Sequence, residues 1–305
     1  MKMGYQHSRT VADDVATAEP IEDAKGRVLD RPIGDLLREA RRLTDEQIEQ
    51  ILLYQREHGL RFGEAALALR LASNDDVVWA LSQQFHYPYA PGENKKNPEL
   101  VIAADPFSQE AEVFRELRSQ LMLGVLSADE PRRALAVLSP NIGDGKTYVA
   151  ANLAVAFSQL GGRTLLIDAD MRTPRSQDVF GLAPTQAGLS SILTGRAEQN
   201  VIQQAANLPS LYLLPVGAVP PNPLELVQRP AFGLLVNELL NKFDHVVVDT
   251  PAAEHGADAR VIAAKCGAAL VMGRKGKSRM KALDALLHAL GKGPVKLAGV
   301  VMNEF

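Results

Sequence analysis

The stretch AVLSPNIGDGKTYVAANLAVAF, residues 136–157, joins a short apolar run to a helical segment through a glycine-containing loop. Residues 140–147 read PNIGDGKT, which matches the phosphate-loop pattern G-x-x-x-x-G-K-[ST] except that Pro140 replaces the first glycine. A strand before the loop and an amphipathic helix after it are the context that this pattern requires. We therefore predict that the loop binds phosphate groups.

The residues of this loop have different tasks. Gly143 and Gly145 allow the backbone to approach phosphate oxygens, and the start of the helix adds N–H donors and a positive dipole end. Lys146 is expected to reach the β- and γ-phosphates, and Thr147 to hold Mg²⁺. An ordinary glycine turn into a helix is the alternative. The predicted nucleotide contacts in this loop are Gly143, Asp144, Gly145, Lys146, Thr147 and Tyr148.

Two further segments place carboxylates at the ends of apolar runs. In LLIDADMR, residues 165–172, Asp168 and Asp170 are two positions apart and would leave the same face of a strand. In HVVVDTPA, residues 245–252, Asp249 ends another apolar run. Nearby carboxylates repel each other unless a cation or a proton lies between them. We therefore predict a Mg²⁺ site made by Thr147, Asp168, Asp170 and Asp249, with solvated strand ends as the alternative.

Short apolar runs alternate with helical segments from about residue 105 onward. Most of the runs lack strict alternation, as expected for strands that are buried on both faces of a parallel sheet. The pattern predicts an α/β domain with a mostly parallel, doubly wound sheet, whose ligand lies at the carboxyl ends of the strands. The predicted strands are 134–139, 164–170, 211–216, 245–250, 268–273 and 297–303, and two predicted helices are 147–160 and 278–290.

Composition narrows the class of protein. The chain has 305 residues, 46% hydrophobic and 23% charged, with a formal net charge of −3, which indicates a globular protein and no nucleic-acid partner. The single cysteine, Cys266, rules out an internal disulfide and fits a reducing cytosol. Because there is neither a signal pattern nor an apolar run of roughly 18–20 residues, we expect a cytoplasmic protein that reaches the membrane only through a partner.

The chain upstream of this domain has a different organisation. Residues 1–29 are polar and aperiodic and are predicted to be a disordered tail. Residues 30–90 carry helical periodicity, with a helix start at Thr44. The Pro- and Gly-containing residues that follow predict a linker over 91–104, before the phosphate-loop domain at 105–305.

The motifs GDGKT, LLIDADMR and VVVDTPA together resemble those of the bacterial tyrosine kinases that control exopolysaccharide and capsule synthesis, a branch of the P-loop ATPases. Asn141 stands where partitioning ATPases carry a signature lysine, which favours the kinase branch. The resemblance implies that the chain binds ATP and Mg²⁺ and transfers the γ-phosphoryl group to a tyrosine. It implies catalytic roles for Lys146, Asp168 and Asp170, with Asp168 also accepting or orienting the tyrosine proton, and an adenine contact for Asn303.

Two features of this family concern assembly. EVFRELR, residues 112–118, fits the family motif E-x-x-R-x-x-R at Glu112, Arg115 and Arg118, and steps of three keep these residues on one helix stripe. The resemblance implies a ring-shaped homo-oligomer, whereas a solvated charged face with local ion pairs is the alternative. It also implies an activator, the cytoplasmic end of a membrane chain-length determinant protein.

Tyrosines are missing where this family usually has a tyrosine-rich segment. None of the six tyrosines follows Tyr212. The acceptor is therefore Tyr5 or another tyrosine of this chain, or a residue of another protein, or the domain hydrolyses ATP without acting as a kinase. The whole chain resembles the shortened kinases of exosortase-linked gene clusters. The alternatives to a kinase are a P-loop ATPase switch and a nucleotide-sensing scaffold of the export machinery.

Residues 30–90 contain an internal repeat with a constant offset of 29 positions, as in 63 − 34 and 84 − 55. A repeated helical pair is the structural interpretation. The pattern also resembles the N-terminal domain of type II secretion ATPases, in which a tandem motif binds cyclic di-GMP. Pro32 stands where the first copy should carry arginine, and a docking module without a ligand is the alternative. The candidate cyclic di-GMP residues are Arg31, Gly34, Gln55, Arg61, Gly63 and Gln84.

Overall fold

The structure is a computed structural model of the 305-residue chain. It describes residues 32–304 apart from 74–75, 78, 82–96, 107, 184, 186 and 197–200. The chain divides into two compact units, residues 1–85 and 86–305. The tail predicted at 1–29 lies outside the described residues.

The first unit contains α1 (Ile33–Arg41), α2 (Asp45–His58) and α3 (Phe62–Ala68). α2 begins as predicted, because Thr44 Oγ1 accepts a bond from the Gln47 N–H at 3.3 Å and Gln47 Oε1 accepts one from the Thr44 N–H at 3.0 Å. These reciprocal bonds satisfy two N–H groups that a helix start leaves without partners. The unit has a small core of its own, made by Leu36, Leu37, Leu43, Ile51, Ala65, Ala66 and Ala80.

The second unit alternates strands and helices, as the sequence predicts. Its strands are β1 (Ala134–Leu138), β2 (Thr164–Asp168), β3 (Gln203–Gln204), β4 (Leu211–Leu214), β5 (His245–Asp249), β6 (Gly267–Arg274) and β7 (Lys296–Asn303). Its helices are α5 (Val101–Ala104), α6 (Gln109–Leu123), α7 (Lys146–Ser158), α8 (Ser176–Val179), α9 (Leu189–Leu193), α10 (Pro223–Gln228), α11 (Pro230–Lys242), α12 (Asp258–Cys266) and α13 (Met280–Gly291), with the 3₁₀ turn η2 at Ala253–His255.

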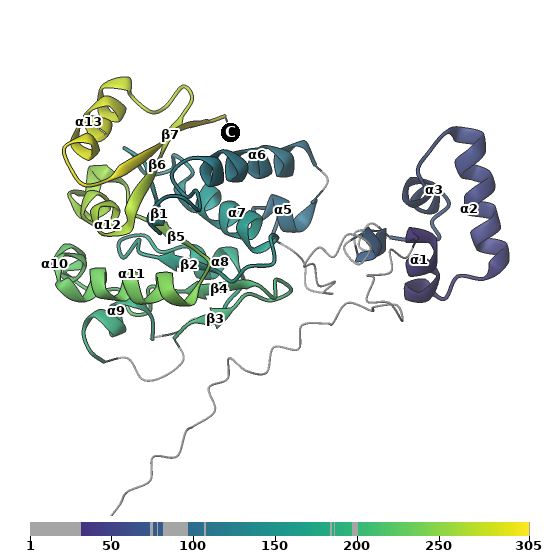
Figure 1. Cartoon of the computed structure of the whole chain (residues 1–305), viewed down its shortest axis with the longest axis horizontal. Coiled ribbons are helices and arrows are strands. Elements are labelled where there is room, and N and C mark those ends of the chain that lie inside the picture. The colour runs from purple at the N-terminus through teal and green to yellow at the C-terminus, as the bar shows by residue number, and fades with distance from the viewer. Residues whose placement is uncertain are drawn as a thin grey trace, which may run out of the picture. The chain divides into compact units, whose positions relative to one another are not determined.

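The seven strands form one sheet in the order β3-β4-β2-β5-β1-β6-β7 (Figure 1). All neighbours pair in parallel except β3 and β4, which are antiparallel. The sequence did not predict β3, because two residues carry no periodic signal. The order brings the carboxyl ends of β1, β2 and β5 together at one edge of the sheet, which is where ligands bind in open α/β sheets.

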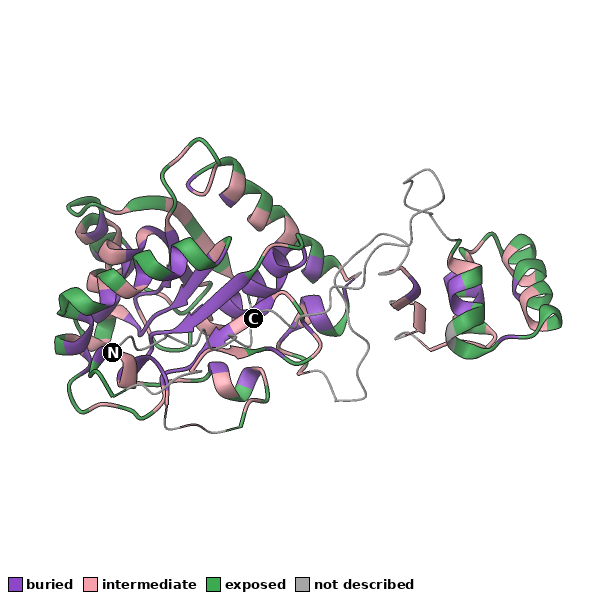
Figure 2. Cartoon of the chain, turned by 60° about the horizontal axis from the view of Figure 1, so that its bottom comes forward, coloured by how far each residue is buried: buried purple, intermediate pink, exposed green. Residues whose placement is uncertain are grey.

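Each face of the sheet is covered by helices and has its own core. On β1, Leu135 and Val137 pack in the core with α6 and α7, whereas Ala136 and Leu138 pack in the core with α11 and α12. Figure 2 shows the central strands buried between these layers. Burial on both faces explains why the predicted strands read as continuous apolar runs and do not alternate.

The helix after the phosphate loop differs from its prediction. We expected it to be amphipathic, but α7 is buried along almost its whole length, from Val149 to Ser158. It lies between the sheet and the layer of α5 and α6, so no face of it remains for solvent. Even so, none of the described helices is both long enough and apolar enough to cross a membrane.

The prediction of a linker over residues 91–104 is partly wrong. Residues 91–96 lie outside the described residues, but 97–104 belong to the second unit and contain α5. Asn97 Nδ2 donates to the Val179 carbonyl at 3.0 Å, and Ile102 is fully buried. The buried Asn152 side chain donates to the Glu99 carbonyl at 2.7 Å. Polar composition therefore concealed a segment that long-range contacts hold in place.

Replacing Gly188 by Ala is expected to destabilise the second unit by about 2 kcal/mol or more. An added Cβ would lie 2.4 Å from both the Gly217 N and the Pro215 carbonyl oxygen, which are backbone atoms that cannot move aside. Denaturant unfolding measures the change. Gly233→Ala in α11 is the matched control, because its nearest atoms are at 3.7 Å or beyond and belong to a flexible lysine. A Gly188→Ala midpoint no lower than that of Gly233→Ala would contradict the prediction.

Candidate active site

The phosphate loop lies between the end of β1 and the first turn of α7. Gly143 and Gly145 have φ angles of +78° and +97°, a backbone region that favours glycine. Lys146 is the first residue of α7, and its side chain is buried. The Pro140 carbonyl accepts a bond from the Glu254 N–H at 3.0 Å. The position of the missing glycine is thus used for pairing with η2, and the loop still turns at its other two glycines.

Asp144 holds the loop from within. Its Oδ2 accepts a bond from the Asn141 N–H at 2.9 Å, and its Oδ1 accepts one from Ser278 Oγ at 2.7 Å. Asn303 Nδ2 donates to the Asp144 carbonyl at 3.3 Å. We predicted Asp144 as a nucleotide contact, but its buried side chain is committed to the loop itself. Its backbone N–H is the group left for such a contact.

The carboxylates at the ends of β2 and β5 lie side by side. Asp168 and Asp249 are partners in the register of the two neighbouring strands, and both are almost fully buried. Thr147 Oγ1 donates to Asp249 Oδ2 at 2.6 Å. The fold therefore brings together three of the four residues that the sequence predicted as a Mg²⁺ site, and two of them, Thr147 and Asp249, are 102 positions apart in the sequence.

Burial and repulsion from neighbouring carboxylates raise the pKa values of Asp168 and Asp249. Burial first, and then the charge of Asp168, raise the pKa of Asp249 to about 8. Burial likewise raises the pKa of Asp168 to about 6, although bonds from Ser176 act in the opposite direction. A site that disfavours two negative charges in this way is one where a cation relieves the repulsion.

Asp168 and Asp170 also organise the loop that follows β2. Asp168 Oδ2 accepts bonds from the Ser176 N–H at 3.1 Å and Ser176 Oγ at 2.7 Å, and its Oδ1 accepts one from the Asp170 N–H at 3.1 Å. Asp170 accepts three bonds, from Arg172 N–H, Thr173 N–H and Thr173 Oγ1. Asp168 is 1% exposed, so its predicted contact with a tyrosine proton would require these partners to move.

The side chains of this site fit a magnesium ion that takes only some of its ligands from the protein. Among the residues that the structure describes, no three His, Cys, Asp or Glu side chains are grouped as a metal site by themselves. Mg²⁺ in phosphoryl-transfer sites is held by one or two protein oxygens together with waters and phosphate oxygens. The buried Asp249 Oδ1 has no hydrogen-bond partner within the described part of the chain and offers such an oxygen.

A cavity of about 900 Å³ opens over the phosphate loop, a size in the range of small-molecule sites. Asp168 and Asp249 are not among its lining residues, because both are covered. Asp170 is the predicted metal carboxylate that does line it. The other predicted site residues on its wall are Gly143, Gly145, Lys146, Thr147, Tyr148 and Asn303.

The predicted oligomerisation stripe lies on α6, where its two arginines bond to neighbouring groups of the same chain. Arg115 Nη1 donates to Glu112 Oε2 at 2.9 Å, and its other nitrogen donates to the Pro106 carbonyl. Arg118 Nη1 donates to the Ala156 carbonyl of α7 at 2.7 Å. These bonds include the local ion pair that the alternative interpretation expected.

The two repeated glycines of the first unit are explained by packing. A Cβ on Gly34 would lie 3.4 Å from the Phe62 ring, and one on Gly63 would lie 2.8 Å from Val77 Cγ1. Arg61 is exposed at the start of α3, where its N–H donates to Glu64 Oε2 at 2.8 Å. Gln55 lies in α2 near its end. Arg31 and Gln84, the other two candidates for cyclic di-GMP, lie outside the described residues.

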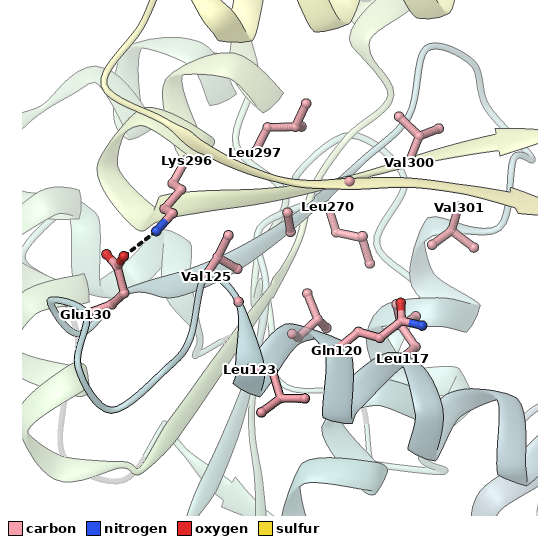
Figure 3. Close-up of a pocket in the computed structure, with 14 residues that line it drawn as sticks. Leu117, Gln120, Leu123, Val125, Glu130, Leu270, Lys296, Leu297, Val300 and Val301 are labelled. Carbon is pink, nitrogen blue, oxygen red and sulfur yellow. Dashed lines mark hydrogen bonds and ion pairs between the residues drawn. The ribbon is translucent and has the colours of Figure 1, made fainter.

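A second cavity, of about 490 Å³, lies between α6 and the edge strand β7 (Figure 3). Leu117 and Val301 line it from the two elements, and the Lys296–Glu130 ion pair lies at one end. None of the residues predicted to contact nucleotide, metal or a second subunit lines this cavity. The nucleotide prediction therefore applies to the cavity over the phosphate loop.

Several polar side chains around the loop were not predicted. Arg274 Nη1 donates to the Gly143 carbonyl at 3.2 Å, and Ser278 and Glu254 also bond to the loop. Ser176 and Thr173 fix the two carboxylates after β2. The contacts of Arg274, Ser278 and Glu254 with the loop join positions more than a hundred apart in the sequence, so no local pattern indicates them. Thr173 and Ser176 follow closely after the residues Asp168, Ala169 and Asp170. This short separation is the signal by which the sequence could have indicated them.

Comparison with protein families supports a nucleotide site. Residues 135–305 match the CobQ/CobB/MinD/ParA nucleotide-binding domain. A putative tyrosine-protein kinase CapB of Staphylococcus aureus is 33% identical over 208 residues, which are 67% of this chain and 89% of that protein. The tyrosine-protein kinase YwqD of Bacillus subtilis is 32% identical over 204 residues, which are 67% of this chain and 85% of that protein.

Larger relatives and solved structures agree. The tyrosine-protein kinase wzc of Salmonella typhimurium is 32% identical over 209 residues, but this chain spans only 29% of its length. The chimerical protein CapA2B2 superposes with a TM-score of 0.63 at 31% identity, covering 73% of this chain and 96% of that one. The kinase domain of the Escherichia coli tyrosine kinase ETK gives 0.64 at 29%, covering 70% and 82%.

Proposed function

We propose that this chain, which belongs to the bacterial tyrosine kinases with a CobQ/CobB/MinD/ParA nucleotide-binding domain, transfers the γ-phosphoryl group of ATP to a tyrosine hydroxyl. One observation carries this proposal. Thr147 Oγ1 lies 2.6 Å from Asp249 Oδ2, and the other oxygen of the same buried carboxylate has no partner in the described structure. A Mg²⁺-nucleotide site needs a hydroxyl and a carboxylate side by side next to the phosphate loop.

The side chains have separate roles in this proposal. Lys146 neutralises charge on the β- and γ-phosphates, and the N–H groups from Gly143 to Tyr148 hold their oxygens. Thr147 and Asp249 would hold the Mg²⁺, and Asp168 and Asp170 would bind it directly or through water. The metal would supply further neutralisation of phosphate charge. Positioning and charge neutralisation then lower the barrier, because the protein contributes no covalent step.

Asp170 and Asn303 are proposed to contact the substrates. Both line the cavity over the loop. Asn303 can donate and accept hydrogen bonds, as an adenine contact requires, although its Nδ2 already donates to the Asp144 carbonyl. Asp170 is the better placed of the paired carboxylates to orient a tyrosine hydroxyl, since Asp168 is covered. Either carboxylate near Mg²⁺ is a weak base, so orientation matters more than proton abstraction.

The biological role that we propose is control of exopolysaccharide chain length, polymerisation or export. We propose a cytoplasmic chain that is recruited to the membrane by the chain-length determinant protein that activates it. We also propose a ring-shaped homo-oligomer in which Glu112, Arg115 and Arg118 meet a neighbouring subunit. Sedimentation of the chain with Mg²⁺-ATP tests the ring, and a wild-type chain that stays monomeric would contradict it. An Arg118→Ala chain that assembles as the wild type does would contradict the role of Arg118.

The test of kinase activity uses the purified chain with Mg²⁺-ATP, with and without the cytoplasmic segment of the chain-length determinant protein. Free phosphate and phosphotyrosine are measured together. We expect phosphotyrosine that depends on the partner. Phosphate release without phosphotyrosine on either protein would instead support the second candidate, an ATPase switch, which the nucleotide-binding domain family also allows.

The first unit is proposed as a docking or sensing module of the type II secretion ATPase kind. Cyclic di-GMP is the ligand to test, with Arg61 as the stacking cation, since an arginine can stack on guanine and bridge a phosphate. Calorimetric titration of the whole chain separates the two roles, because binding that Arg61→Ala abolishes would support sensing. The absence of binding to the wild type would leave docking as the role of this unit.

A further inference from the structure

Glu254 bonds to the phosphate loop from the segment that follows β5. Its Oε1 accepts a bond from the Ile142 N–H, and its Oε2 accepts one from Asn141 Nδ2 at 3.3 Å. The backbone reinforces the contact, because the Ala253 N–H donates to the Ser139 carbonyl at 2.9 Å. The start of the loop is therefore attached to η2 by both backbone and side-chain bonds.

The Ile142 end of this contact lies at the cavity over the phosphate loop, which Glu254 itself does not line. Ile142 and Lys146 line that cavity. The pKa of Glu254 is held below its usual value, first by the Ile142 N–H and in smaller part by the positive charge of Lys146. The lysine of a phosphate loop reaches the β- and γ-phosphates. The carboxylate of Glu254 is thus within electrostatic reach of the group that would meet the terminal phosphate.

The N–H groups of a phosphate loop are donors for phosphate oxygens. A carboxylate on one of them stands where an anionic oxygen of a ligand would otherwise be. Glu254 is itself exposed to solvent, so the contact is easily displaced and contributes little stability of its own. Its effect is expected on the ligand, because two negative groups close to one N–H and one lysine repel each other.

We propose that Glu254 is a specificity-determining residue that disfavours ATP relative to ADP, because it occupies the Ile142 N–H and holds a negative charge beside the place where the terminal phosphate of ATP would lie. The β-phosphate of ADP ends before this position and leaves the contact in place. ATP must displace the carboxylate, and displacement loosens η2, which begins four positions after Asp249. The inference rests on the proposed nucleotide site but not on the identity of the phosphate acceptor.

The test is calorimetric titration of the whole chain with Mg²⁺-ATP and with Mg²⁺-ADP at low salt. Glu254→Gln keeps the size of the side chain and an oxygen that can accept the Ile142 N–H, and it removes the charge. It is expected to shift the ratio of affinities toward ATP by about fivefold, and the shift should shrink as salt is added. Glu254→Ala, which removes charge and contact together, should shift the ratio in the same direction.

Glu110→Gln is the control for the removal of one negative charge, because Glu110 is an exposed carboxylate that lines the cavity over the phosphate loop from α6. It should leave the ATP-to-ADP ratio within twofold of the wild type. The inference is overturned if both nucleotides bind to Glu254→Gln with the wild-type ratio, or if both affinities fall together, which would make Glu254 a support for the loop alone. Failure of either nucleotide to bind the folded wild-type chain would overturn the proposed function as well.

Discussion

Lys146→Met is expected to lower the rate of phosphoryl transfer from ATP by at least about a hundredfold. Lys146 is 7% exposed and lines the cavity over the loop, so its charge acts where little water screens it. Met has an unbranched side chain of similar length, so we expect the packing of the buried side chain at the start of α7 to be kept. Phosphotyrosine formation and phosphate release, followed together, measure the change.

The matched control is Lys281→Met, a lysine that is exposed on α13. It should retain the wild-type rate within about twofold, since surface charges contribute little. Thermal unfolding of the Lys146→Met chain should show a fold close to that of the wild type. A folded Lys146→Met chain that kept more than a tenth of the activity would mean that the loop does not hold the reacting phosphates.

Asp249→Asn is expected to lower the activity and to raise the stability of the metal-free chain. Transfer should fall by about a hundredfold or more, because the neutral amide is a poor substitute for a carboxylate toward Mg²⁺. The amide can still accept the bond from Thr147 Oγ1, and it removes the repulsion between Asp249 and Asp168. The metal-free variant should therefore be more stable than the wild type at pH 8, by roughly 1–3 kcal/mol.

The sign of the pH dependence follows from the raised pKa of Asp249, which is about 8 in the folded chain. A carboxyl group whose pKa is higher in the folded state keeps its proton there while the unfolded chain loses it. The stability that protonated Asp249 contributes to the metal-free wild type is thus fully present below about pH 4 and is lost as the pH rises toward 8. Asp249→Asn should show a shallower decline in denaturant unfolding. Parallel profiles for the two chains would contradict the account.

Much of the fold could be predicted, because its signals are local or follow from general rules of topology. Gly143 and Gly145, followed by Lys146, predict a phosphate loop that leads into a helix. Apolar runs without alternation indicated parallel strands. Since parallel strands end at the same edge, Asp168 and Asp249 could be expected to meet, and the structure pairs them in register.

The remaining features depend on contacts that no local pattern carries. The Asn141–Glu254 bond joins positions 113 apart in the sequence, and nothing around Glu254 distinguishes it from a solvated acid. The polar residues around Asn97 predict a linker, yet the side-chain amide of Asn97 bonds to the Val179 carbonyl of α8. The burial of α7 on all sides also depends on α5 and α6 lying over it, which the sequence of α7 does not reveal.

The most direct test of the central claim is to follow the γ-phosphate itself. The whole chain is incubated with Mg²⁺-ATP labelled in the γ-phosphate and with the cytoplasmic segment of the chain-length determinant protein, and the label is then located by peptide mapping. The account predicts label on tyrosine in the wild type and none with Lys146→Met. Label recovered only as free phosphate, with unmodified tyrosines on both proteins, would contradict the kinase and leave an ATPase.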